Sequence, residues 1–405
     1  MEMEPDPTAF SSAVIRRAPE DFVVEELPAY PPSGHGEHLF VTFRKRGLTT
    51  PDALRALARA LDADLRGAGA AGMKDRHAVT TQTASFPFPM ARDAEAAVAQ
   101  LALPGVEILG VARHDNKLKP GHLLGNRFTV ALRDVPAGEA AGLVERLATI
   151  GRIGVPNAFG SQRFGRDGDN PARALAWLAG RERGPRDKRE QRMLFSSLQS
   201  LLFNRVLQRR VAADTWATVL PGDVAKKLDS GGLFTVPLEG PELDDARARA
   251  EAGSLSATGP MFGAKMRWPE GEPAALEREV LAAGAGPGPG PGPGPGTGTG
   301  TGTDEPLRFE AWKHLGEGTR RALRLQVGEM EARIEPAEGD TVTVIARFVL
   351  PKGGYATTVL ARACRIVDAT AREDRGRPDR VTPASSNDGG DVEPVDGASD
   401  DVQEP

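Results

Sequence analysis

The chain has 405 residues, 40% of them apolar, and a net charge of −5, so two domains with sizeable cores are expected. Cys364 is the only cysteine, which excludes an intrachain disulfide and a zinc site built from cysteines. The N-terminus is acidic and lacks a secretory signal, and no run approaches the roughly 18 apolar residues of a membrane span. We therefore expect a cytoplasmic protein without membrane contact.

Five segments carry a clear secondary-structure pattern. They are a strand at 38–44, a helix at 51–66, a strand at 128–135, a helix at 191–210 and a strand at 341–349. Apolar residues alternate in the strands and recur every three to four positions in the helices. Thr50 and Pro51 supply an N-cap and a first-turn proline for the first helix. The pattern predicts an α+β body.

Two segments cannot build a packed core. Residues 283–302 alternate Gly with Ala, Pro or Thr, and residues 381–405 are rich in Asp, Gly, Ser and Pro. The second segment holds seven acids and no Lys or Arg, so residues 1–380 carry a net charge of +2. That mildly basic body has clustered cations, for example at 181–192, which is compatible with RNA binding. A solvated charged helix face has the same composition.

Motifs for metal, nucleotide or nucleophilic hydrolase chemistry are missing. There is no phosphate-binding loop, and the Gly-Pro repeat matches a dinucleotide pattern only trivially. His35 and His38 have a metal-like spacing without acidic or cysteine partners arranged as a site, and no Ser-His or Cys-His signature is present. We expect chemistry that uses neither metal nor cofactor.

One segment carries a specific catalytic pattern. Residues 72–80 read GMKDRHAVT and are followed by Gln82, which resembles the G-x-K-D-[KR]-x-A-V-T-x-Q motif of the TruD family of tRNA pseudouridine synthases. Further segments resemble that family in the same order, at 20–26, 34–39, 117–118, 125–133, 154–165 and 347–358. The sequence departs from the family at Ala158, where Tyr is usual, and at Arg16, where Lys is frequent.

The resemblance implies an enzyme that converts a uridine of tRNA, at position 13 in the D-arm region, to pseudouridine. Asp75 matches the family's catalytic aspartate, which acts either as a nucleophile or as a base. The adjacent cations Lys74 and Arg76 favour the ionised carboxylate. Arg16 either forms an ion pair with Asp75 or, together with its neighbour Arg17, is a solvated surface charge. On local sequence alone, the favoured interpretation of Asp75 is a surface loop residue in an ion pair.

Substrate contacts follow from the same resemblance. A uridine in folded RNA must be extracted, and the extracted base needs a stacking partner, for which Phe128 and Phe348 are candidates. Both also fit simple core packing. Asn126 can present its amide to the base, the sugar or Asp75, or it can serve as a turn residue. Arg16 and Lys74 complete the predicted substrate site. Candidates for contact with RNA phosphates, each of which could also be a solvated charge, are Lys45, Lys117, Arg163 and Arg166.

The resemblance also implies an architecture. Residues 1–154 and 319–370 form a pseudouridine-synthase core with a mixed sheet and a central cleft. Residues 155–318 form an inserted domain, which includes the low-complexity loop, and 371–405 form a disordered acidic tail. The expected partner is tRNA, with no protein partner and a monomeric chain.

Two other classes of function remain open. One is a catalytically inactive RNA-binding protein of the same fold, which the intact motif around Asp75 argues against. The other is a glycosidase-like hydrolase, which needs a second carboxylate near the first. Glu25 and Glu26 could supply one, although no spacing selects them.

Overall fold

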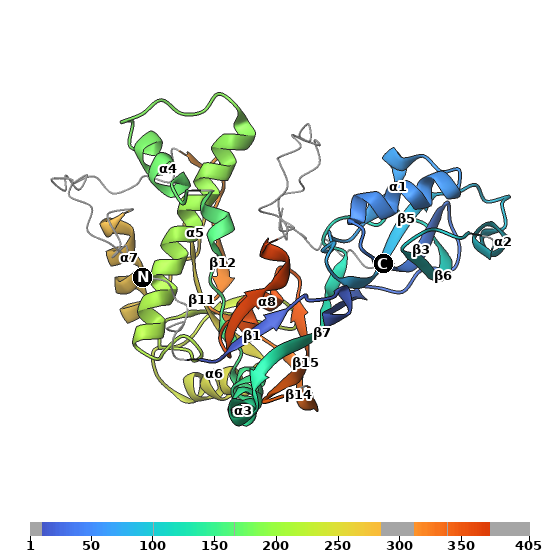
Figure 1. Cartoon of the computed structure of the whole chain (residues 1–405). Helices are drawn as coiled ribbons and strands as arrows, with labels where there is room; N and C mark the ends of the chain where they lie inside the picture. Colours follow the sequence, from blue (N-terminus) through green and yellow to red (C-terminus); the bar gives the residue numbers. More distant parts are fainter. Residues whose placement is uncertain (1–9, 100, 166, 285–311, 338, 373–405) are drawn as a thin grey trace. The chain divides into compact units, whose positions relative to one another are not determined.

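The computed structural model describes residues 10–99, 101–165, 167–284, 312–337 and 339–372, which divide into two units (Figure 1). The N-terminal unit consists of Val14–Arg133, Pro351–Gly353 and the described residues from Val367 onward. The large unit consists of the described residues up to Ala13, Asp134–Leu350 and Gly354–Ile366. Arg166 and most of both the acidic tail and the low-complexity segment lie outside the described residues.

A mixed sheet forms the N-terminal unit, with the strand order β7-β2-β5-β3-β6 and β4 paired to β5. The strands are β2 (Phe22–Pro28), β3 (His38–Arg46), β4 (Gly69–Ala70), β5 (Val79–Pro87), β6 (Val106–His114) and β7 (Leu123–Pro136). The neighbours β2 and β5 run parallel, with Val23 opposite Val79, whereas the other pairs are antiparallel. The loops that enter β2 and β5 therefore lie at the same end of the sheet.

Helix α1 (Thr50–Ala60) covers one face of this sheet, and its bounds differ from the predicted 51–66. Its N-cap is Thr49 rather than the predicted Thr50, because the Thr49 hydroxyl accepts a hydrogen bond from the amide of Asp52 at 3.2 Å. The helix ends early since Asp62 adopts a φ of 51°, a left-handed conformation that helices do not propagate. Thr50 is buried, and its hydroxyl is available to the neighbouring loop.

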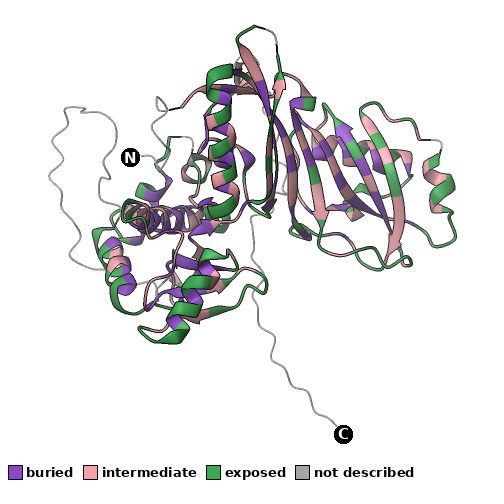
Figure 2. Ribbon diagram, turned by 90° about the horizontal axis from the view of Figure 1, so that it is seen from below, coloured by how far each residue is buried: buried purple, intermediate pink, exposed green. Residues whose placement is uncertain are grey.

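The core of the N-terminal unit lies between α1 and β3. Leu39, Val41 and Phe43 alternate along β3 and pack with Leu57 of α1 in one cluster of buried side chains. Figure 2 shows buried residues following the strands in this alternating way. Lys45 is the next residue on the same face of β3 and is also fully buried.

The large unit combines a hairpin and a second sheet. The hairpin strands β14 (Gly328–Pro336) and β15 (Thr341–Pro351) pair antiparallel, and α3 (Ala137–Ile153) packs on β14. The second sheet has the order β10-β9-β11-β12. Its strands are β9 (Val224–Lys227), β10 (Leu233–Thr235), β11 (Leu255–Met261) and β12 (Thr319–Ala322), and its helices are α4 (Asn170–Leu178), α5 (Lys188–Ala212), α6 (Pro241–Glu251) and α7 (Gly271–Ala283).

Short elements complete the described chain. They are β1 (Ser12–Ile15), η1 (Pro19–Asp21), η2 (Leu65–Gly67), α2 (Ala94–Ala99), β8 (Val155–Pro156), η3 (Ser161–Phe164), β13 (Arg324–Leu325), α8 (Ala356–Leu360), β16 (Arg365–Asp368) and η5 (Ala369–Arg372). The predicted strands and the second predicted helix are confirmed as β3, β7, β15 and α5. Each is longer than predicted, and β7 differs most, because it begins at Leu123 rather than at Phe128. The α+β class with a mixed sheet is confirmed. None of the helices in the described part of the chain has the length and apolarity of a membrane span.

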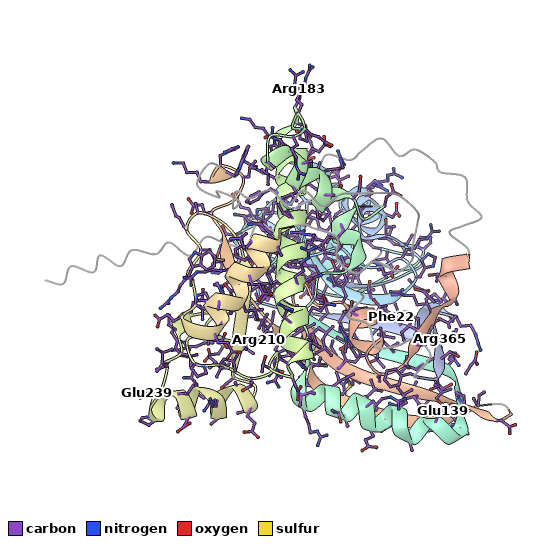
Figure 3. All side chains as sticks on the ribbon, turned by 90° about the vertical axis from the view of Figure 1, so that its left-hand side faces the viewer. Phe22, Glu139, Arg183, Arg210, Glu239 and Arg365 are labelled. Atoms are coloured by element: carbon purple, nitrogen blue, oxygen red, sulfur yellow. The ribbon has the colours of Figure 1, made fainter. Side chains whose placement is uncertain are left out.

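Among the described residues of the large unit, two ion pairs are buried. The guanidinium of Arg210, which Figure 3 labels on α5, donates to both carboxylate oxygens of Asp223 at 3.0 and 2.9 Å. Arg320 binds Glu277 in the same two-point manner at 2.8 and 2.7 Å. Burial raises the pKa of Glu277, while the hydrogen bond and charge of Arg320 oppose that effect. Each arginine is tolerable inside the protein only while its carboxylate is present.

We expect Asp223→Ala to destabilise the large unit by about 3–5 kcal/mol, because it leaves the Arg210 charge buried without its partner. Asp245→Ala, which removes an exposed acid on α6 paired with Arg249, is the matched control and should cost less than about 1 kcal/mol. All four tryptophans lie in the large unit, so urea unfolding followed by tryptophan fluorescence measures this difference. Equal destabilisation by the two substitutions would contradict the prediction.

Candidate active site

Asp75 lies in the loop 71–78, which connects β4 to β5 and has no helix or strand of its own. Side chains from elsewhere in the N-terminal unit hold its backbone. The Thr50 hydroxyl accepts a hydrogen bond from the Lys74 amide at 2.9 Å, and the Lys45 ammonium donates to the Asp75 carbonyl at 2.7 Å. The carbonyl of Ala71 accepts from the amide of Gly121 at 2.8 Å. The backbone of the loop is thus held at Ala71, Lys74 and Asp75.

Both oxygens of the Asp75 carboxylate have a donor. Oδ2 lies 2.9 Å from Nη2 of Arg16, and Oδ1 accepts a hydrogen bond from the His77 amide at 2.9 Å. The Asp75 side chain is still 36% exposed. The carboxylate is therefore oriented on one side and open to a ligand on the other.

Arg16 connects Asp75 to a second carboxylate. Its Nη1 lies 2.5 Å from Oδ2 of Asp368, and its guanidinium lies over the ring of Phe22 at 4.2 Å from the centroid. Asp368 in turn accepts hydrogen bonds from the amide and the hydroxyl of Thr370 at 3.0 and 2.7 Å. Burial raises the pKa of Asp368, but the Thr370 hydrogen bonds and the Arg16 charge outweigh it, so the pKa is lowered.

Lys74 is a buried member of an ion pair. Its ammonium lies 2.6 Å from Oε2 of Glu26, and both side chains are almost fully enclosed. The other oxygen of Glu26 accepts a hydrogen bond from the amide of Thr83 at 3.2 Å. The sequence predicts that the adjacent cations Lys74 and Arg76 favour the ionised carboxylate of Asp75. The cation that contacts the Asp75 carboxylate is instead Arg16, since the Lys74 ammonium is bound to Glu26.

The predicted phosphate contact of Lys45 needs correction. Lys45 is 0% exposed, and its ammonium donates to the carbonyls of Leu48 at 2.8 Å and of Asp75 at 2.7 Å. Strand alternation places it on the core face of β3, so its charge cannot reach RNA in this conformation. Burial lowers the pKa of Lys45 to about 8; the charge of Asp75 opposes this effect and that of Lys74 adds to it.

Strand β7 presents the predicted pocket residues. Phe128 is 7% exposed and makes an edge contact with Phe22, the ring beneath Arg16, at a centroid distance of 6.1 Å. Asn126 lies opposite Glu26 in the β2–β7 register. Within the described residues, the buried Oδ1 of Asn126 accepts no hydrogen bond, which leaves a costly unmet acceptor. A chain of contacts therefore links Asp75 through Arg16 and Phe22 to Phe128.

The remaining predicted residues that the structure describes are spread over both units. Phe348 belongs to the large unit, where it is fully buried on β15. Lys117 is partly exposed in the N-terminal unit and donates to the carbonyl of Arg66 at 3.2 Å. Arg163 is exposed in the large unit and binds the hydroxyls of Ser196 and Ser200. Arg166 lies outside the described residues.

Sequence reasoning did not identify three residues that shape the site. The sequence offers Glu26 only as a second acid for hydrolysis, although alternation with Phe22 and Val24 places it on the inner face of β2. The sequence predicts Thr50 as the helix cap, yet its hydroxyl binds the loop. Asp368 carries no local signal, because its role depends on Arg16 at the other end of the chain.

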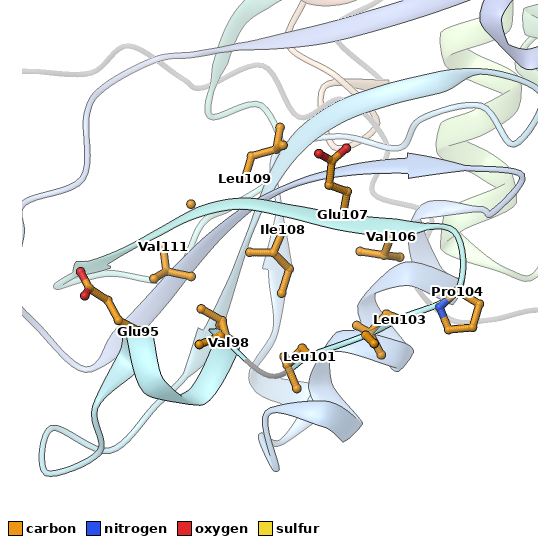
Figure 4. A pocket seen from close by; sticks show the side chains of 13 residues that line it. Glu95, Val98, Leu101, Leu103, Pro104, Val106, Glu107, Ile108, Leu109 and Val111 are labelled. Carbon is orange, nitrogen blue, oxygen red and sulfur yellow. The ribbon is translucent and has the colours of Figure 1, made fainter.

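A hollow between α2 and β6 is lined mainly by aliphatic side chains, among them Val98, Leu101 and Ile108 (Figure 4). None of the predicted site residues lines it. The hollow is therefore a feature separate from the loop 71–78 that carries Asp75.

The structure resembles the crystal structure of the putative tRNA pseudouridine synthase D from Methanosarcina mazei, with a TM-score of 0.73 and 22% sequence identity. The likeness covers 91% of this chain and 97% of that chain. The fold is therefore that of a pseudouridine synthase.

Sequence comparison defines the family. A family profile described as tRNA pseudouridine synthase D (TruD) matches residues 8–171 and 187–285. The chain is 45% identical over 356 residues to the tRNA pseudouridine synthase D of Anaeromyxobacter dehalogenans strain 2CP-C, covering 86% of this chain and 92% of that protein. It is 39% identical over 355 residues to that of Thermus thermophilus, covering 87% and 88%. The chain belongs to the TruD family of tRNA pseudouridine synthases and is an isomerase.

The lowered pKa of Lys45 predicts a pH effect on stability. Between pH 8 and about 10.5 the unfolded chain holds this proton and the folded chain releases it, so folding stability gains with rising pH in this window. Relative to Lys45→Met, wild type should gain about 1 kcal/mol between pH 8 and pH 9. Urea unfolding of both proteins followed by circular dichroism measures the difference. A difference that stays constant with pH would contradict the prediction.

Proposed function

We propose that this protein converts a uridine of tRNA to pseudouridine, with Asp75 as the catalytic carboxylate and no cofactor. The observation that carries the proposal is the state of Asp75: both of its oxygens are held by donors, yet 36% of the side chain is open to a ligand. Family membership supports the reaction type, and the anchored loop supports the assignment to this residue.

The reaction moves one bond within the substrate. The bond from uracil N1 to the sugar breaks, the base rotates, its C5 joins the same sugar carbon, and the C5 proton leaves while N1 gains one. Asp75 serves either as a nucleophile on the substrate or as a base that removes a sugar proton. Both roles require a carboxylate held in a fixed direction, and the contact with the guanidinium of Arg16 provides that orientation.

Asn126 and Phe128 are the proposed contacts of the extracted base. The unmet Oδ1 of Asn126 is an acceptor suited to the N3–H of uracil or to a ribose hydroxyl. Phe128 offers a ring edge-on to Phe22, and base–aromatic stacking contributes about 1–3 kcal/mol. Phe348 is fully buried, so a base could stack on it only if the residues that cover its ring moved.

The wider proposal follows the family. Lys117 and Arg163 contact tRNA phosphates, and the target is uridine 13 in the D-arm region. Residues 1–154 and 319–370 form the catalytic core around the inserted residues 155–318. The protein works as a monomer in the cytoplasm, without a protein partner. The exposure of Arg163 and the partial exposure of Lys117 support phosphate contact.

The reaction is tested with unmodified tRNA that carries tritium at C5 of uridine. Isomerisation releases the label and keeps the base in the RNA, which is the expected result. Hydrolysis of the glycosidic bond would release free uracil instead. A protein that only binds tRNA would release neither, and either of these outcomes contradicts the proposal.

Asp75→Asn should abolish isomerisation and spare tRNA binding. The change is nearly isosteric and removes the negative charge, and loss of acid–base catalysis alone costs about 10²–10⁴ in rate. Affinity should change by less than about tenfold, because phosphate contacts lie elsewhere. Single-turnover pseudouridine formation and filter binding at fixed salt measure both. Substantial activity, after deamidation to Asp is excluded, would overturn the assignment.

Asn126→Ala should lower the single-turnover rate about tenfold or more without lowering the melting temperature. Its Oδ1 accepts no hydrogen bond among the described residues, so removing it relieves a buried, unmet acceptor. Asn116→Ala, in the loop between β6 and β7, is the control and should retain wild-type activity. Loss of activity in step with loss of stability would show that Asn126 only supports the strand.

A further inference from the structure

The connection between α4 and α5 carries a dense group of cations. We define the basic tip as residues 181–192, which combine six cations with three acids, a net charge of +3 in a chain of −5. The cations are Arg181, Arg183, Arg186, Lys188, Arg189 and Arg192, and all six side chains are exposed. Figure 3 shows Arg183 at the outer tip of the connection between α4 and α5, beyond the side chains around it.

Two of the three acids have local structural roles. The Asp187 carboxylate caps α5 by accepting a hydrogen bond from the Arg189 amide at 3.0 Å. Glu190 lies 2.9 Å from the guanidinium of Arg173 on α4. Asp187 thus stabilises the start of α5 and Glu190 links α5 to α4, while the six cations of the basic tip are exposed.

The connection has a defined conformation. Trp177 of α4 packs directly against Gly184, where a Cβ atom would lie only 2.1 Å from the indole nitrogen. The side chain of Gln191 donates to the carbonyl of Pro185 at 2.7 Å, and the amide of Arg181 donates to the carbonyl of Ala176 at 2.9 Å. The charges are therefore presented by an ordered turn, which lowers the entropic cost of binding a ligand.

The TruD profile matches the chain on both sides of this turn but not at residues 172–186. Arg181, Arg183 and Arg186 fall in the unmatched segment, so the family pattern does not account for them. An ordered turn with exposed arginines and no exposed aromatic side chain suits a polyanion better than a protein partner, whose interface core needs apolar anchors.

We propose that the basic tip binds the phosphate backbone of tRNA, as a surface that adds affinity without taking part in the chemistry. The proposal rests on tRNA being the substrate. Arginine recognises phosphate through two parallel hydrogen bonds, and each contact releases counterions, so the affinity it adds falls as salt rises.

The test compares two triple variants of the full-length protein. Arg181→Gln/Arg183→Gln/Arg186→Gln neutralises the tip. Arg209→Gln/Arg247→Gln/Arg278→Gln removes the same charge from exposed arginines on α5, α6 and α7. Binding of unmodified tRNA is titrated between about 50 and 200 mM salt. The tip variant should bind tRNA about tenfold more weakly at low salt. In a plot of log Kd against the logarithm of the salt concentration, its slope should be smaller than that of wild type by about two to three. The control should keep the wild-type slope.

Turnover distinguishes this inference from the proposed function. At saturating tRNA the tip variant should form pseudouridine at the wild-type single-turnover rate. Wild-type affinity and slope in the tip variant, or equal losses in both variants, would overturn the basic tip as a binding surface and leave the reaction intact. If the wild-type protein binds tRNA through the basic tip but forms no pseudouridine, the proposed function is wrong and the basic tip is still a tRNA-binding surface.

Discussion

The contact between the guanidinium of Arg16 and the carboxylate of Asp75 is the interaction on which the candidate site depends. Asp75 lies in a loop without regular structure, so backbone geometry alone does not direct its side chain. Arg16 is itself fixed by Asp368 and by the ring of Phe22. The parallel pairing of β2 and β5 brings the two entering loops to one end of the sheet, which makes this contact possible.

Two buried lysines hold the loop 71–78 in place. Lys74 is enclosed with Glu26, and Lys45 is bound to two backbone carbonyls. Burying an ammonium group is costly, and replacing a buried ion pair with apolar side chains often leaves stability unchanged or raises it. The two lysines instead fix the backbone around Asp75, while the Asp75 side chain stays partly exposed. The loop that carries Asp75 is therefore preformed.

Much of this could be predicted from sequence, because periodicity and motif spacing are local. Alternation along 341–349 located β15, and the motif around Asp75 located the loop. The contacts of that loop were harder, since they join distant segments. Lys74 adjoins Asp75 in sequence, yet its side chain turns to Glu26. Lys45 resembled a surface cation, although the alternation of Leu39, Val41 and Phe43 already placed it on the core face of β3.

The most direct test of this account is the single-turnover rate of Arg16→Gln with saturating tRNA. Arg17→Gln, an exposed neighbour, is the matched control. Arg16→Gln removes the charge that orients the carboxylate, so we expect a rate at least about tenfold lower with tRNA affinity and melting temperature close to wild type. Arg17→Gln should keep the wild-type rate. A wild-type rate in Arg16→Gln would contradict the claim that this guanidinium positions Asp75.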